Sequence, residues 1–309
     1  MRIPFLSAPD IRLTTVDLGT RSIQIPVAEF EGKRPGKTLL ITGGMDGDEY
    51  TGMEASYRLV ERYRDRNFAG RLIIIPIVNI PGFEGECSWN PMDMRFPKHI
   101  YPGNPAGMPT ARLVSWLTQT HASRANLWHD MHAGSITEGL RPFVWLHETG
   151  KKDTDALMRL ARERFDADLF VAERVSGASK AGALAKHGCG YILTESGQRG
   201  ERDETCVARQ VVWAESSMAL LGMIDAPATS KRAPEVLTVV TYDRSALTGL
   251  WRPVLPVPKK LVRGQVIGTC LRLDGTGMRD VRASTSGTPL WWKETMKIQK
   301  DELVVAIGS

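Results

Sequence analysis

Cysteine is scarce in this chain: the 309 residues include four, Cys87, Cys189, Cys206 and Cys270. No two of them stand in a Cys-x-x-Cys pair, and their spacing gives no dense framework. The sequence therefore predicts neither a disulfide-stapled fold nor a cysteine zinc site. We interpret the four side chains as reduced thiols, mostly buried, in a cytoplasmic protein.

Long apolar runs and one-sided charge are missing as well. No stretch approaches the ~20 apolar residues that cross a bilayer, and the apolar part of Met1–Pro9 is too short for a signal peptide. Lys and Arg number 40 against 35 Asp and Glu, and the resulting +5 is spread along the chain without a basic run. We therefore expect no membrane and no nucleic-acid partner.

What is present is the composition of an ordinary globular protein, 42% hydrophobic and 24% charged. This length suffices for one large and one small domain, each with its own core. Apolar strand patterns alternate with amphipathic helix patterns over the first two thirds of the chain, which predicts an α/β fold, a three-layer α/β/α sandwich around a mostly parallel mixed sheet. We expect strands at 22–30, 39–41, 71–78, 127–131, 142–146, 169–172 and 191–194, and helices at 51–63, 110–122, 153–164, 179–187 and 202–221.

The composition changes near residues 225–234, where Ala, Pro, Thr and Ser predominate. This change is typical of a domain boundary, and beyond it only short strand and turn patterns follow. We therefore divide the chain into an α/β domain at 1–228 and a small all-β domain at 229–309. The strands expected in the second part are 236–242, 260–264, 266–273, 279–283 and 303–307.

Three acidic residues follow the apolar strand Leu39–Ile41, directly after Gly43 and Gly44. They lie between that strand and a helix pattern, where open α/β sheets place their ligand sites. Two of them, Asp46 and Glu49, are three residues apart and can converge on one divalent metal. The alternative is a solvated acidic loop that caps the helix.

A third ligand candidate ends a later strand. The segment 125–134 reads as a strand that finishes at His132, and the ends of two strands in one sheet can meet in space. The alternative for His132 is a packing or hydrogen-bonding role. We expect Asp130, two residues earlier, on the opposite strand face, near His132 only if the strand end is twisted.

Several segments carry a resemblance to a known family. Residues Gly43–Glu49 read Gly-Gly-Met-Asp-Gly-Asp-Glu and resemble the Gly-Gly-x-His-Gly-Asp-Glu signature of the succinylglutamate desuccinylase/aspartoacylase family, which are zinc carboxypeptidase-like metallo-deacylases. Asp130–His132 resembles the family's Asp-Leu-His, and Leu193–Gly197 resembles the segment of its catalytic glutamate. Val78–Phe83 and Tyr101–Gly103 follow in family order, and the C-terminal part resembles the family's small lipoyl-like β module.

The resemblance implies a metal-dependent amidohydrolase (deacylase) acting on a small N-acyl compound. One divalent metal, zinc first, would be held by Asp46, Glu49 and His132, with Glu195 as general base and acid. Asp46 departs from the family, which has histidine there, so manganese or another hard metal is an alternative. Two carboxylates and one neutral imidazole cancel the double positive charge of the metal. We therefore expect the metal-bound water to be less acidic, and the pH optimum of the activity to be higher, than in members with two histidines and one glutamate. The alternative for Glu195 is a salt-bridged helix-start residue.

A second departure concerns the substrate. Where the family has an arginine and an Asn-Arg pair, this chain has Ser88, Lys98 and His99, and neither serine nor histidine offers the bidentate fork of arginine. We therefore expect a less acidic, even aromatic, leaving part, because the same loop carries three aromatic residues. The candidates for substrate binding are Arg95, Lys98, His99 and Arg141.

Two other kinds of function stay open. A member that has lost catalysis would act as a ligand-binding or structural protein, for which the replaced histidine and arginines are the evidence. An esterase or carboxypeptidase would use the same site on another bond. A homo-oligomer also stays open as the assembly state.

Overall fold

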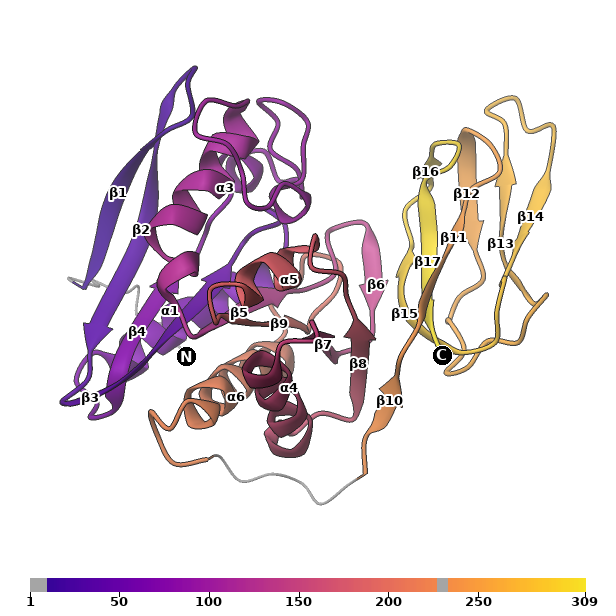
Figure 1. Ribbon diagram of the computed structural model, residues 1–309. Helices are drawn as coiled ribbons and strands as arrows, with labels where there is room; N and C mark the ends of the chain where they lie inside the picture. The colour runs from indigo at the N-terminus through magenta and orange to yellow at the C-terminus, as the bar shows by residue number, and fades with distance from the viewer. Residues whose placement is uncertain (1–9, 227–232) are drawn as a thin grey trace.

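The computed structural model describes residues 10–226 and 233–309 and has two parts that lie side by side (Figure 1). The larger part is built on a nine-stranded mixed sheet of order β1-β2-β4-β3-β5-β9-β7-β8-β10. Its strands are β1 (Ile11–Asp17), β2 (Ser22–Glu31), β3 (Arg34–Gly43), β4 (Ala69–Ile75), β5 (Leu127–His132), β7 (Phe143–Glu148), β8 (Leu169–Arg174), β9 (Gly190–Glu195) and β10 (Glu235–Leu237). The central strands β4, β3, β5 and β9 run parallel, so their carboxyl ends lie at one edge.

Helices cover both faces of this sheet. On one face α1 (Tyr50–Tyr63), α4 (Lys152–Arg164) and α6 (Glu204–Leu220) share a buried core with the strands. On the other face α3 (Pro109–Thr120) and α5 (Lys180–Ala185) pack in a second core around Trp128. Strands buried from both sides read as continuous apolar runs, as β4 does. The predicted three-layer α/β/α sandwich is confirmed.

The smaller part is all β, as predicted. One sheet has the order β11-β17-β15-β6 and the other β14-β13-β12-β16, and their shared core includes Trp251, Cys270 and Ile307. The strands are β6 (Glu138–Leu140), β11 (Val240–Arg244), β12 (Gly249–Pro253), β13 (Val266–Leu271), β14 (Arg279–Arg282), β15 (Thr288–Lys293), β16 (Lys297–Ile298) and β17 (Leu303–Gly308).

The two parts exchange strands. Strand β10, from the later part of the chain, extends the large sheet beside β8, while β6, from the earlier part, joins the small sheet beside β15. The expected boundary at 228/229 lies outside the described residues. The expected single strand 236–242 is wrong: it divides into β10 and β11, and between them the backbone N–H groups of Thr238 and Val239 bond to Ser309 O.

Other local expectations need correction. Residues 260–264 form no strand, because only Leu261 makes an isolated bridge, to Gly287, and Gly264 adopts a left-handed φ of +86°. Between the expected strand 71–78 and the expected helix 110–122, the chain also forms a short helix, α2 (Ile80–Glu84), and a 3-10 turn, η1 (Pro97–His99). None of the helices within 10–226 and 233–309 is long and apolar enough to span a membrane.

Candidate active site

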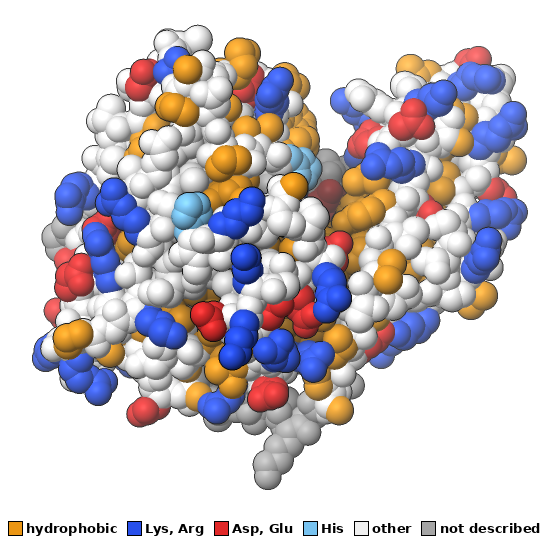
Figure 2. Space-filling view, viewed as in Figure 1, with side chains coloured by type: hydrophobic (Ala, Val, Ile, Leu, Met, Phe, Trp, Pro, Cys, Tyr) orange, Lys and Arg blue, Asp and Glu red, His pale blue; other side chains and the backbone are white. Residues whose placement is uncertain are grey.

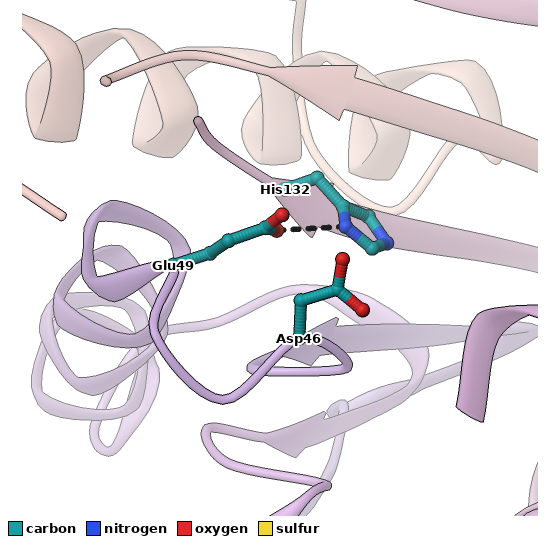
Figure 3. A group of neighbouring side chains, drawn as sticks. All are labelled: Asp46, Glu49 and His132. Atoms are coloured by element: carbon teal, nitrogen blue, oxygen red, sulfur yellow. Dashed lines mark hydrogen bonds and ion pairs between the residues drawn. The ribbon is translucent and has the colours of Figure 1, made fainter. Parts of the chain in front are cut away.

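Three side chains converge at the carboxyl edge of the large sheet (Figure 3). Asp46 and Glu49 come from the turn between β3 and α1, and His132 ends β5, which pairs with β3 in parallel register. One ligand atom from each lies within 4.8 Å of the other two, and all three residues are at most 3% exposed. His132 Nδ1 lies 2.8 Å from Glu49 Oε2. The sequence-based grouping of these residues therefore agrees with the geometry.

The turn that carries the acidic residues is held tightly. A Cβ atom on Gly47 would lie 2.1 Å from the backbone carbon of Gly82 in α2, so only glycine allows this approach. Asp48 points away from the cluster: its carboxylate accepts hydrogen bonds from the Ser88 hydroxyl at 2.7 Å and from the Ile136 N–H at 3.3 Å. Asp48 therefore fixes the turn, while its two acidic neighbours face His132.

The residues present fit a divalent cation. Buried Asp46 Oδ1 has no hydrogen-bond partner among the described residues, although buried carboxylate oxygens are normally satisfied. Burial, and after it the neighbouring Asp46 charge, raise the pKa of Glu49 well above its ordinary value. Two crowded carboxylates and one imidazole are a donor set that zinc or a harder divalent metal accepts.

Behind His132 lies a buried polar network centred on Asp130. Its Oδ2 lies 3.3 Å from His132 Nε2 and accepts hydrogen bonds from the Tyr191 hydroxyl at 2.7 Å and from Lys180 Nζ at 3.3 Å. Burial opposes the charged carboxylate, but His132 and Lys180 outweigh it and hold the Asp130 pKa below its ordinary value. The expectation that Asp130 faces away from His132 is wrong, since residues two apart on a strand share a face.

Lys180 is a site residue that sequence reasoning missed. Its side chain is 14% exposed, and its ammonium lies 4.3 Å from the centre of the Tyr191 ring and 5.0 Å from that of Trp128. No motif marks it, because α5 has no family signature and a single lysine on a short helix reads as a surface charge. Only the packing of α5 against β9, the strand beside β5, brings Lys180 to Asp130.

Glu195 ends β9, directly opposite His132 in the register of the two parallel strands. Its Oε2 is buried and has no hydrogen-bond partner within the described part of the chain. Burial raises the Glu195 pKa to about 7, with His132 and Lys98 acting in the opposite direction. A carboxyl group of this kind can both accept and donate a proton near neutral pH.

Of the four residues expected to bind substrate, Lys98 contacts the ligand cluster. It comes from η1 and forms an ion pair with Asp46 Oδ2. His99 and Arg95 are exposed on the same loop. Arg141 instead donates to the carbonyl of Pro258, 2.8 Å away in the small domain. Substrate binding by these four stays a prediction.

A hollow lies between the two parts on the face of the molecule seen in Figure 2. Tyr242 on β11 is 41% exposed. Burial raises the pKa of Glu138 on β6, and the charge of Lys98 opposes this shift. Because β6 belongs to the small sheet, the charge of Lys98 acts on a group of the smaller part.

Comparison with known proteins shows to which family this chain is similar. Residues 35–221 match the family model described as "Succinylglutamate desuccinylase/Aspartoacylase catalytic domain". The chain belongs to this family. The resemblance noted from the sequence is thereby confirmed, and with it membership among deacylases that act on amide bonds. Members of this family are typically metal-dependent.

Individual members of the family show how far the similarity extends. An N-alpha-acetyl-L-2,4-diaminobutyric acid deacetylase from Halomonas elongata is 25% identical over 274 residues, 86% of this chain and 80% of that protein. A succinylglutamate desuccinylase/aspartoacylase structure from Rhodobacter sphaeroides has a TM-score of 0.82 at 22% identity, covering 97% and 94% of the two chains. The product-bound ectoine utilization protein EutE (DoeB) from Ruegeria pomeroyi has a TM-score of 0.80 at 24% identity, covering 93% and 89%. These two structures have the same fold as this chain.

Proposed function

We propose that this chain is a metal-dependent amidohydrolase that removes the acyl group from a small N-acyl compound. The observation that carries the proposal is the buried convergence of Asp46, Glu49 and His132, with Asp46 Oδ1 left without a partner among the described residues. These three side chains would hold one divalent cation, zinc first and manganese or another hard metal as the alternative. When bound, such a cation polarises a carbonyl and makes water easier to deprotonate.

Glu195 has the proton-transfer role in this proposal. Its Oε2 accepts a proton from the water that attacks the substrate carbonyl carbon, and then donates this proton to the amide nitrogen as the carbon–nitrogen bond breaks. Asp130 Oδ2 lies 3.3 Å from Nε2 of His132, and its charge would help to orient the ring, as carboxylates do for ligating histidines. The products are a carboxylic acid from the acyl part and an amine from the leaving part.

The substrate class follows from relatives and from the loop at 88–99. The named substrate of the Halomonas elongata relative is an N-acetylated amino acid, which supports a small N-acyl amino compound. Trp89 and Phe96 pack edge to face at 6.0 Å beside Lys98, and this supports a less acidic or aromatic leaving part. We also propose a cytoplasmic location, supported by four free cysteines.

One observation favours a second candidate, a binding protein without catalysis. Two ion pairs, Lys98 with Asp46 and His132 with Glu49, satisfy much of the cluster's charge within the chain itself. In such a protein Lys98 would take the place of a cation. An esterase or carboxypeptidase would use the same residues on a different bond, so the substrates tested must include esters and peptides.

The deciding experiment combines metal analysis with one substitution. Purified protein, freed of metal and reloaded with zinc or manganese, is tested on N-acyl amino acids with acidic, neutral, basic and aromatic side chains. Glu195→Gln should lower kcat by roughly 10²- to 10⁴-fold while the metal content stays equal, and Glu163→Gln, exposed on α4, should match the wild type. An absence of hydrolysis in every metal-loaded wild-type sample would leave the binding protein as the function.

A further inference from the structure

Lys98 and Asp46 form an ion pair inside the candidate metal site. Asp46 is 1% exposed and Lys98 31% exposed, measured on the side chains. The pair occupies Asp46 Oδ2, while the other oxygen, Oδ1, has no partner within the described residues. The two oxygens of the Asp46 carboxylate therefore differ. One is paired with Lys98, and the other is available to bind a cation beside Glu49 and His132.

The charges of the site explain why this pair matters. Exchanging a neutral histidine for Asp46 adds one negative charge to the ligand set, and the ammonium of Lys98 adds one positive charge beside it. Asp46, Glu49, His132 and Lys98 together carry one net negative charge, the same as two histidines and one glutamate. The higher pH optimum stays a prediction from the three ligands alone, and the charge of Lys98 acts against it.

The surroundings of Lys98 keep it at this position. Its ammonium lies 5.6 Å from the centre of the Phe96 ring. Burial disfavours its charged form, but Asp46 and Glu49 outweigh burial and raise its pKa. A lysine committed in this way to a buried carboxylate is poorly placed to serve as a free clamp for a substrate carboxylate.

We propose that Lys98 is a positioning residue that tunes the metal site through Asp46. It holds Oδ2, leaves Oδ1 as the single ligand atom of Asp46, and restores the positive charge that the Asp46 departure removes. The inference rests on the proposed metal-dependent function. Its consequence is that Asp46 and Lys98 form one functional unit, in which either substitution alone is unfavourable for turnover.

The test is Lys98→Met, which keeps the length and apolar stem of the side chain and removes the charge. Without the ammonium, zinc no longer competes with Lys98 for the Asp46 carboxylate. Zinc affinity should therefore rise by about tenfold, measured by competition with a chromophoric chelator. Turnover should fall, because the site has lost a positive charge, and kcat should decrease by about tenfold with little change in KM. Lys98→Arg should keep zinc affinity within about twofold of the wild type.

A matched control and a double substitution complete the design. Lys260→Met removes a lysine from an ion pair with Glu235 on β10 and should change neither zinc affinity nor kcat. In an Asp46→His background Lys98 has no carboxylate to hold, so adding Lys98→Met should change zinc affinity and kcat less than it does in the wild type. The double-substitution cycle measures this coupling directly.

Each other outcome overturns the inference in a recognisable way. Unchanged or weaker zinc binding by Lys98→Met, in a wild type that binds zinc and hydrolyses amides, rejects Lys98 as a tuning residue and leaves the proposed function standing. A raised KM with unchanged zinc affinity assigns Lys98 to substrate binding instead. A wild type that binds no zinc, beside a Lys98→Met variant that does, shows that Lys98 replaces the metal, which rejects both proposals.

Discussion

Asp130→Asn tests whether the network behind His132 serves the metal site. Asp130 is fully buried and accepts hydrogen bonds from Thr42 at 2.6 Å, Tyr191 at 2.7 Å and Lys180 at 3.3 Å, besides its contact with His132. Asparagine keeps the shape and one accepting oxygen but removes the charge. The ring of His132 then loses its anionic partner, and Lys180 loses its counter-charge.

Two separate costs follow from these contacts. A carboxylate that orients a ligating histidine is worth about 10- to 100-fold in metal affinity, which corresponds to about 1.4 to 2.7 kcal/mol. Leaving the largely buried Lys180 unpaired costs about 3 to 5 kcal/mol of folding free energy. The first cost acts on zinc binding and the second on stability, so they can be measured apart.

The assay compares Asp130→Asn with the double variant Asp130→Asn/Lys180→Met. Urea unfolding should show that most of the lost stability returns in the double variant, because no unpaired charge remains. Zinc affinity, measured by chelator competition on folded protein, should stay low in both variants. Full recovery of zinc affinity together with stability would refute the reasoning, since the loss would then come from a weakened fold and not from His132.

Two further predictions concern stability and the ligand turn. Burial lowers the pKa of His129 to about 3 in the folded protein, whereas its pKa in the unfolded chain is about 6.5. Between these two pH values only the unfolded chain binds a proton at His129. The free energy of unfolding therefore decreases as the pH falls below about 6.5. His129 should account for about 2 kcal/mol of the unfolding free energy lost between pH 7 and pH 5, and His129→Gln should reduce that loss in urea titrations; an unchanged pH dependence would contradict the assignment. Gly47→Ala should push the turn off Gly82 and weaken zinc binding, whereas Gly177→Ala, with open space around it, should bind zinc like the wild type; equal affinities in both would show that the turn tolerates the methyl group.

Much of the fold could be predicted because its signals are local. The apolar run at Leu39–Ile41, the glycines after it and the helix pattern from Thr51 together indicate a strand, a turn and a helix. The strand exchange could not be predicted in this way. Strand β10 has only three residues, Glu235–Leu237, and its partner β8 is selected by tertiary packing that leaves no periodic pattern.

In the candidate site, too, some residues could be predicted from the sequence and others could not. Asp46, Glu49 and His132 could be grouped because residues at the ends of neighbouring parallel strands must meet. The partners Lys98 and Lys180 come from a 3-10 turn and a short helix, where sequence spacing does not determine which way a long side chain reaches. Their pairing with Asp46 and Asp130 depends on the folded loops alone.

The strand exchange between the two parts makes each sheet depend on the other part of the chain. Each part lends the other a strand, β6 in one direction and β10 in the other, so neither sheet is complete without its neighbour. Without those strands, the sheet edges would expose unpaired backbone N–H and C=O groups, which can pair with other chains and cause aggregation. Replacing the small part with an unrelated domain would therefore leave the large sheet without β10 and expose its edge at β8.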